Sequence, residues 1–161
     1  MRILSLDWIY VLDEDFTYQP PDELRFQYPT GYAFQDRLDV RRLVLHPDGR
    51  ITVLKGYAWD GCTPKFALWD IVIGIPDGMP HPETQKPKAY HASLVHDALY
   101  QFLDADLPLT RKTVDLMFLD LLTRHEFAPR RIYYRAVRIF GGLFRRFTRW
   151  KRGYRGQRLA L

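Results

Sequence analysis

The sequence lacks the cysteines that staple small secreted proteins, because its single cysteine, Cys62, cannot form a disulfide within the chain. It also lacks any apolar run close to the roughly 20 residues that a membrane-spanning helix needs. Residues 1–8 do not form the apolar core of a signal peptide, since Asp7 interrupts them. We therefore expect a protein without a membrane span or a signal peptide, made in the cytoplasm.

Acidic residues are missing from residues 127–161, which carry eleven arginines or lysines. The other 13 bases and all 19 acids lie in residues 1–126, so this larger part has a net charge of −6 while the whole chain has +5. The basic end can bind phosphates on nucleic acid, lie on an anionic membrane or bind an acidic partner protein. The arginines available for such a contact are Arg130, Arg131, Arg135, Arg138, Arg145, Arg146 and Arg149.

Two further readings of the basic end bear on its partners. Nothing in it resembles a sequence-reading nucleic-acid module, so sequence-specific binding to nucleic acid is not expected. Equally open is a solvated helix face whose aromatic residues pack onto the acidic body of the same chain.

The strand-forming residues lie in the first third of the chain, where β-branched and aromatic residues dominate short runs. The clearest hairpin joins residues 40–45 to residues 50–54, because Pro-Asp-Gly is a turn sequence. Residues 66–75 are apolar and could form a helix or a buried strand; Asp70 slightly favours the helix.

Helical periodicity follows after residue 89. The first predicted helix covers about residues 90–103, and the second begins after a cap at Thr110 and ends near residue 126. A third apolar stripe covers residues 132–140, after which Gly141 and Gly142 can bend or end the helix.

These patterns predict one α+β domain over residues 1–142. In it, an N-terminal antiparallel sheet of short strands is followed by a packed unit of two or three helices. A basic C-terminal extension follows over residues 143–161, and its last part, from residue 151, reads as a loose tail.

The residues suited to chemistry gather on the first predicted helix. His96 and Tyr100 are four positions apart and share a face, whereas Asp97 points roughly 100° away. In an antiparallel helix pair, Asp115 comes to the height of His96, so the two side chains can touch. A carboxylate on one ring nitrogen leaves the other nitrogen able to take a proton. We therefore predict a catalytic group of His96, Asp115 and Tyr100, with His96 as the general base.

A metal site and a purely structural role are both compatible with these residues. Asp97 offers a hard oxygen ligand for Ca²⁺ or Mg²⁺, and Asp60, in a loop between two glycines, could add a second ligand beside the dyad. In the competing interpretation, His96, Tyr100 and Asp115 form a closed hydrogen-bond network whose only role is to fix how the helices dock. The residues alone leave an active site and a structural network equally open, and Asp97 taken by itself is better interpreted as a charge on the helix surface.

Four motifs in a fixed order carry a family resemblance. They are Gly56-Tyr-Ala-Trp-Asp-Gly-Cys-Thr-Pro64, Ala92-Ser-Leu-Val-His-Asp-Ala-Leu-Tyr100, Arg111 with Asp115 and Phe118, and Tyr134-Arg-Ala-Val-Arg-Ile-Phe-Gly141. Together they resemble a family of small uncharacterised proteins common in phage and prophage genomes. The likeness covers about residues 50–142. It implies a phage or prophage origin, and hence a location in the host cytoplasm or in the virion.

A second, local likeness is to secreted phospholipases A2, in which a His-Asp-x-x-Tyr helix pairs with an aspartate on an antiparallel helix and a glycine-rich loop binds calcium. It implies His96 as the base, Asp97 as a calcium ligand and Asp115 as the orienting acid. This chain departs from that family because no cysteines flank the His-Asp pair and because its loop holds fewer glycines.

Two functions from different classes follow as predictions. The first is a small phage-type hydrolase with His96 as base, Asp115 as orienting acid, and Asp60 and Asp97 as candidate ligands of a divalent metal. The second is a non-catalytic phage structural protein or tail or virion assembly protein. In that case the His-Asp network only holds the helices, and the arginine-rich end docks onto neighbouring subunits.

Overall fold

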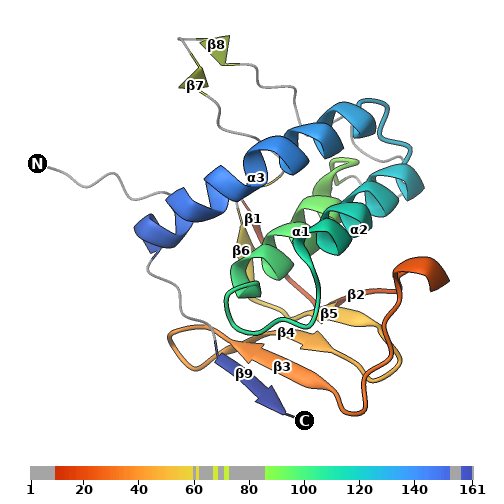
Figure 1. Cartoon of the computed structure of the whole chain (residues 1–161), viewed down its shortest axis with the longest axis vertical. Helices are drawn as coiled ribbons and strands as arrows, with labels where there is room; N and C mark the ends of the chain where they lie inside the picture. Colours follow the sequence, from red (N-terminus) through yellow and green to blue (C-terminus); the bar gives the residue numbers. More distant parts are fainter. Residues whose placement is uncertain are drawn as a thin grey trace, which may run out of the picture.

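Helices lie over one face of an antiparallel sheet in this protein (Figure 1). The computed structural model describes residues 10–59, 61, 67–68, 71–72, 86–152 and 157–160. Strands come first in this part of the chain and helices follow, except for one strand at the C-terminal end. The predicted α+β class is therefore confirmed. Within the described residues, no helix has the length and apolar character needed to cross a membrane.

The larger sheet has five antiparallel strands. Their spatial order is β2 (Phe16–Tyr18), β5 (Ile51–Val53), β4 (Arg41–Leu45), β3 (Tyr32–Gln35) and β9 (Gln157–Ala160). The predicted hairpin forms its centre, with Leu45 of β4 opposite Ile51 of β5. Gly49 closes the turn with a φ of 84°, and a Cβ there would lie 2.4 Å from the carbonyl oxygen of Phe26. This turn therefore requires glycine.

Two short ladders and one helical turn complete the strand region. β1 (Tyr10–Val11) pairs with β6 (Ala58–Trp59), and a single 3₁₀ turn covers Asp22–Leu24. β7 (Ala67–Leu68) pairs with β8 (Ile71–Val72), so our preference for a helix in this segment was wrong. The β-branched pair in β8 favours extended backbone more strongly than one aspartate disfavours it.

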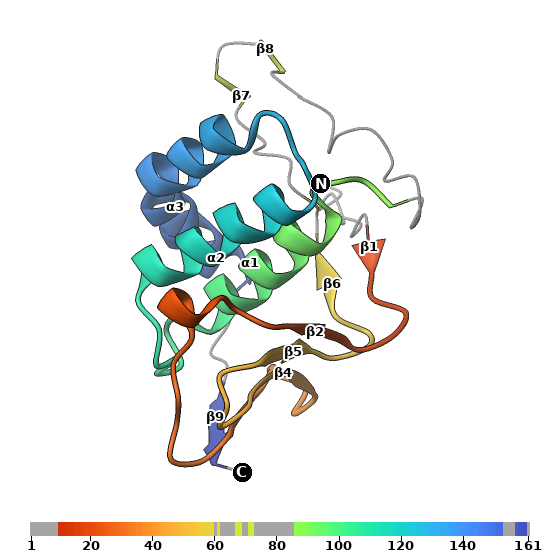
Figure 2. The ribbon, with the colours of Figure 1, turned by 90° about the vertical axis from the view of Figure 1, so that its right-hand side faces the viewer.

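Three helices form the second layer: α1 (Tyr90–Phe102), α2 (Arg111–Arg124) and α3 (Arg130–Arg152). The side chain of Thr110 accepts a hydrogen bond from the backbone nitrogen of Thr113, which confirms the predicted cap. A short connection joins α1 to α2, and the two helices lie side by side over the sheet, with α3 beyond them (Figure 2).

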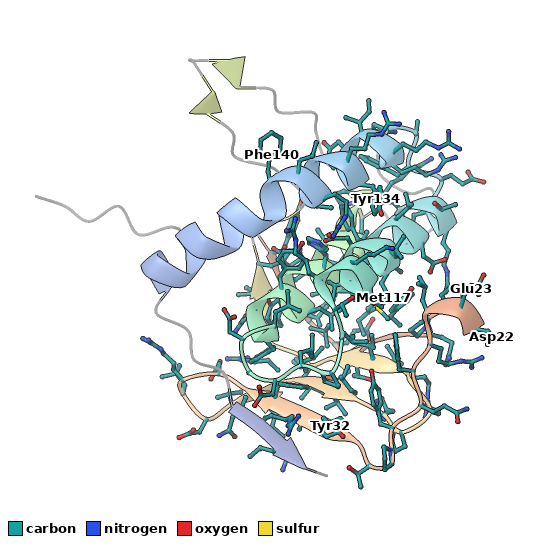
Figure 3. The ribbon with its side chains drawn as sticks, viewed as in Figure 1. Asp22, Glu23, Tyr32, Met117, Tyr134 and Phe140 are labelled. Atoms are coloured by element: carbon teal, nitrogen blue, oxygen red, sulfur yellow. The ribbon has the colours of Figure 1, made fainter. Side chains whose placement is uncertain are left out.

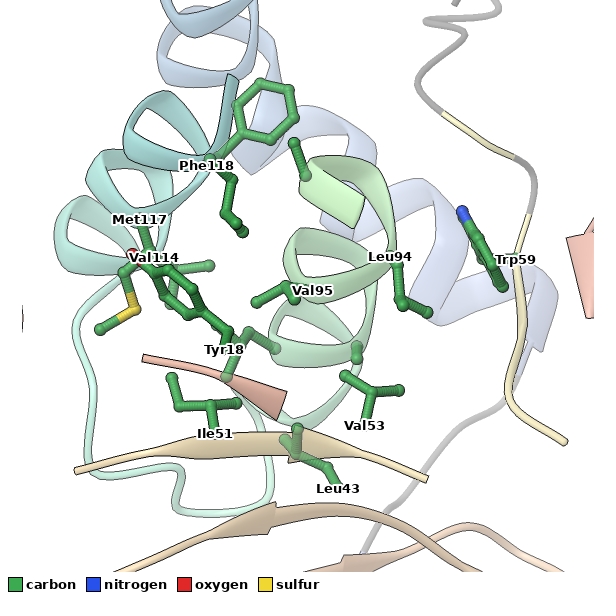
Figure 4. Close-up of a cluster of buried hydrophobic side chains, with 14 of the residues drawn as sticks. Tyr18, Leu43, Ile51, Val53, Trp59, Leu94, Val95, Val114, Met117 and Phe118 are labelled. Atoms are coloured by element: carbon green, nitrogen blue, oxygen red, sulfur yellow. The ribbon is translucent and has the colours of Figure 1, made fainter. Parts of the chain in front are cut away.

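The core fills the space between the helices and the sheet (Figure 3). Strand side chains meet side chains of α1 and α2 there, as the close-up in Figure 4 shows. The residues with at most 1% exposure include Leu43, Ile51, Val53, Leu94, Val95, Val114 and Met117. Burial of each such side chain contributes about 1.5–3 kcal/mol to folding. The core therefore fixes α1 and α2 against the sheet and so sets the height of one helix relative to the other.

The C-terminal part is more ordered than the sequence predicted. The backbone of α3 continues through Gly141 and Gly142, across the boundary that we predicted after residue 142. Our expectation of a loose tail was wrong for residues 157–160, because β9 pairs with β3. An edge strand such as β3 exposes backbone donors and acceptors, and a neighbouring segment satisfies them whatever its side chains are.

Candidate active site

His96 and Asp115 touch across the α1–α2 pair, as the helical periodicity predicted. The Nε2 atom of His96 lies 3.1 Å from Oδ1 of Asp115. The ring of Tyr100, four residues further along α1, lies 4.2 Å from the His96 ring, measured between centroids. All three side chains predicted as a catalytic group are therefore in one place.

Asp115 is the centre of this group, and its side chain is 0% exposed. The hydroxyl of Tyr100 donates to Oδ1 at 2.6 Å. On the other oxygen, Nη1 of Arg138 donates to Oδ2 at 2.9 Å. Each oxygen of the buried carboxylate thus has charged or polar partners, as a buried charge requires. His96, Tyr100 and Arg138 come from two different helices, so the carboxylate on α2 joins all three.

Arg138 has a role that the sequence analysis missed. We had counted it among the arginines available to an external partner, but its guanidinium pairs with Asp115 inside the helical unit. Tyr133 and Gly141 are buried and mark the side of α3 that contacts the other helices. Arg138 lies at the edge of that side, where its guanidinium can reach Asp115. The distance in sequence between positions 115 and 138 left no local signal for this pair.

Arg111 is a second residue whose role came from the structure. Its Nε donates to the hydroxyl oxygen of Tyr100 at 3.1 Å. Its Nη2 donates to the backbone carbonyls of Val137, at 3.0 Å, and of Arg138. Arg111 therefore ties the backbone of α3 to Tyr100. The signal available in the sequence was its spacing of four residues from Asp115, which places both on one face of α2.

Gly141 allows α3 to approach the site closely. A Cβ at this position would lie 2.7 Å from the hydroxyl oxygen of Tyr100 and 3.3 Å from Nη2 of Arg111. The first distance is shorter than real carbon contacts, so a larger residue would push α3 away. We had predicted that this glycine would bend or end the helix. It instead supplies the room in which Tyr100 and Arg111 meet the helix backbone.

Charges in the site shift the pKa values of its members. Burial alone would raise the pKa of Asp115, but its contacts with His96, Tyr100 and Arg138 outweigh burial and hold that pKa below its usual value. Burial alone would lower the pKa of His96, but the carboxylates of Asp115 and Asp97 outweigh it and raise that pKa above 6.5. Burial and the neighbouring Asp115 raise the pKa of Tyr100. Asp115 is therefore an anion and Tyr100 a neutral hydroxyl near pH 7.

The second ring nitrogen of His96 faces a different carboxylate. Nδ1 lies 3.9 Å from Oδ1 of Asp97, which is too long for a hydrogen bond. The His96 side chain is 10% exposed and that of Asp97 is 32% exposed. Nδ1 therefore faces Asp97, whose carboxylate is more exposed than that of Asp115.

The predicted metal ligands are only partly described. Asp60 lies outside the described residues, whereas Asp97 is on α1 next to His96. No cluster of three or more His, Cys, Asp or Glu side chains suited to a metal occurs among the described residues. The role of Asp97 as a metal ligand therefore stays a prediction from the sequence.

Trp59, the last residue of β6, links this strand to α1 through a hydrogen bond. Its indole Nε1 donates to Oγ of Ser93 at 3.1 Å, and that hydroxyl donates to the carbonyl oxygen of Tyr90 at 2.9 Å. Ser93 precedes His96 by three residues, which is less than one helical turn. The end of β6 is therefore held beside the stretch of α1 that carries His96.

Comparisons with known proteins found no similar protein from which a role for this site could be inferred. No family model, no curated protein and no solved structure matches the chain. The likenesses to a phage family and to phospholipases A2 stay predictions from the sequence.

Proposed function

We propose that this protein is a small hydrolase in which His96 acts as the general base. One observation carries the proposal. Nε2 of His96 is held by the buried carboxylate of Asp115 at 3.1 Å, while Nδ1 makes no hydrogen bond to the described residues and faces the partly exposed Asp97. A ring oriented through one nitrogen, with the other turned toward an accessible side, is the arrangement that proton abstraction needs.

The proton path in this mechanism is short. Nε2–H donates to Asp115, so Nδ1 of the neutral ring carries the lone pair. Nδ1 takes a proton from water or from a substrate hydroxyl, and the oxygen nucleophile attacks the carbonyl or phosphoryl centre of the substrate. The bond from that centre to the leaving group breaks, and the imidazolium returns the proton to the leaving group, which restores the neutral ring. The anionic Asp115 stabilises the imidazolium that forms. Tyr100 and Arg138 keep that carboxylate in place, since both donate to it.

A divalent cation such as Ca²⁺ or Mg²⁺ remains part of the proposal through Asp97 and Asp60. Asp97 lies close enough to His96 to hold a cation near a substrate oxygen. No step of the proposed mechanism passes through a metal, because the proton transfer needs only His96 and Asp115.

A second candidate function has its own supporting observation. Asp115 is fully buried and joins all three helices, and Arg111 adds bonds to the backbone of α3. A network of this kind can be wholly structural. The corresponding proposal is a non-catalytic phage structural or assembly protein, in which the helical unit is a rigid base for docking onto neighbouring subunits.

Substitution of His96 distinguishes the two functions. The full-length protein is assayed against a panel of carboxylic esters, phosphoesters and amides, with and without Ca²⁺ or Mg²⁺. For a hydrolase, His96→Gln lowers kcat/KM by at least 100-fold, the low end for loss of a general base. The matched control is His46→Gln, which removes a histidine bonded to Thr52 on the sheet and leaves the rate unchanged. A wild-type chain that turns over no member of the panel, together with its recovery at fixed copy number in purified virions, favours the structural function.

A further inference from the structure

The side of α3 turned away from the other helices exposes both arginine and large aliphatic side chains. Ile132 is 64% exposed and Ile139 is 70% exposed. Arg131 and Arg135 are exposed as well. Figure 3 shows the two sides of the helix: Tyr134 lies on the side facing α2, whereas Phe140 projects from the opposite side. Exposure of two isoleucines on one helix is costly in water, at roughly 1.5–3 kcal/mol each relative to burial.

These four residues lie within about 100° of one another around the helix axis, with Arg131 at one edge and Ile132 at the other, and we call this face the outer stripe (Arg131, Ile132, Arg135 and Ile139). At about 100° per residue, Ile132 and Ile139 are only about 20° apart around the axis, and Arg135 lies about 40–60° from each. The buried Tyr133 and Gly141 occupy the other side. The outer stripe is therefore a surface separate from the His96 site, and its members take no part in the hydrogen bonds around Asp115.

The charge around the outer stripe has a single sign. Residues 127–161 hold eleven bases and no acid. Arg138 is partly neutralised by Asp115, but no such ion pair engages Arg131 or Arg135 among the described residues. Like charge repels α3 of a second copy, whereas a negatively charged surface with an apolar layer is complementary to the arginines and isoleucines of the stripe.

We propose that the outer stripe of α3 binds an anionic lipid surface, with the helix lying parallel to that surface. Guanidinium groups pair with phosphate through two parallel hydrogen bonds, and aliphatic side chains between them enter the boundary between headgroups and acyl chains. The stripe contains only these two chemistries. Its arginines need anions and its isoleucines need apolar groups, and the headgroup and acyl layers of an anionic phospholipid surface supply both. This inference stands independently of the hydrolase proposal.

Sedimentation of the full chain with lipid vesicles tests the inference. One set of vesicles is phosphatidylcholine alone, and the other contains about one third phosphatidylglycerol. The wild-type chain should bind the anionic vesicles and lose that binding as salt rises, because surface charges are screened. Replacement of Arg131 and Arg135 by Gln should lower the partition coefficient about 25-fold, since each basic side chain near such a surface contributes about fivefold. Adding Ile132→Ser and Ile139→Ser should lower it further.

A matched control lies on the far side of the molecule. The connection between β3 and β4, together with the first residue of β4, also exposes two arginines and two aliphatic residues: Arg37, Leu38, Val40 and Arg41. Their replacement by Gln and Ser in the same pattern should change the partition coefficient less than twofold. Equal losses in the two variants would show that net charge alone drives binding and would overturn the proposal. Failure of the wild-type chain to bind anionic vesicles while it binds polyglutamate would overturn it in favour of an acidic protein partner. Circular dichroism of each variant checks that it is folded.

Discussion

Arg138 and Asp115 form an ion pair at 2.9 Å between α3 and α2, and the carboxylate in this pair is fully buried. His96 uses the other oxygen of the same carboxylate. One anion is thus shared between a fixed cation and the ring that we propose as a base. Arg138 reduces the negative potential at His96, and it also holds α3 on the site.

The substitution Arg138→Gln should therefore change both stability and the titration of His96. We expect a loss of about 2 kcal/mol in the free energy of unfolding, less than for a fully buried pair because the Arg138 side chain is 36% exposed. The pKa of His96 should rise, since the remaining negative charge of Asp115 is then less compensated. Urea denaturation and NMR titration of the histidine rings measure the two effects. Arg135→Gln, on the outer stripe, is the control and should leave both quantities nearly unchanged; an unaltered His96 pKa in Arg138→Gln would contradict the prediction.

Gly141→Ala should lower stability by about 1–3 kcal/mol through overpacking. The added Cβ would lie 2.7 Å from the hydroxyl oxygen of Tyr100, although alanine is the better helix former. The double variant with Tyr100→Phe removes the hydroxyl that the Cβ meets. A double-mutant cycle by urea denaturation should therefore show that Gly141→Ala costs less in the Tyr100→Phe background than in the wild-type chain. Equal costs in both backgrounds would place the strain elsewhere.

The raised pKa of His96 predicts a stability that depends on pH. Because the folded-state pKa exceeds the unfolded value of about 6.5, the imidazolium stabilises the fold fully below pH 6.5. That contribution is lost as pH rises through the folded-state pKa. Unfolding free energies measured between pH 5.5 and about 9 should fall over this range in the wild-type chain and less in His96→Gln.

Hydrolytic activity, if it is carried by the neutral ring, should rise over the same pH range in which this stability is lost.

Asp115 makes stability fall, rather than rise, as the pH is lowered into the acid range. Its lowered pKa gives stability above about pH 4 that disappears as pH falls through the folded-state value. If stability has the same pH profile in the wild-type chain and in His96→Gln, the predicted rise of the His96 pKa is contradicted.

A divalent cation should raise the melting temperature if Asp97 takes part in a metal site. Binding only to the folded chain stabilises it by about 2.7 kcal/mol at a cation concentration 100 times Kd. Thermal unfolding with added Ca²⁺ or Mg²⁺ measures this shift, which should disappear in Asp97→Asn and in Asp60→Asn. Asp48→Asn, on the exposed hairpin turn, should retain it. A melting temperature that neither cation changes would remove the metal from the proposed function.

The sequence by itself determined the features that depend on neighbours along the chain. The β4–β5 hairpin follows from its turn residues, and α1 and α2 follow from apolar periodicity and the Thr110 cap. The contact between His96 and Asp115 was predictable for the same reason, since a short connection between two regular helices sets their relative height. The fold class needed only this local information.

The tertiary structure alone decided what α3 and the C-terminal end contribute. Arg138 reaches Asp115, Gly141 admits Tyr100, and β9 completes the sheet beside β3. Each of these contacts joins segments that are far apart in sequence, so no periodicity or turn signal specifies it. They form because buried charges and open strand edges must be satisfied by whichever segment the folded chain brings close.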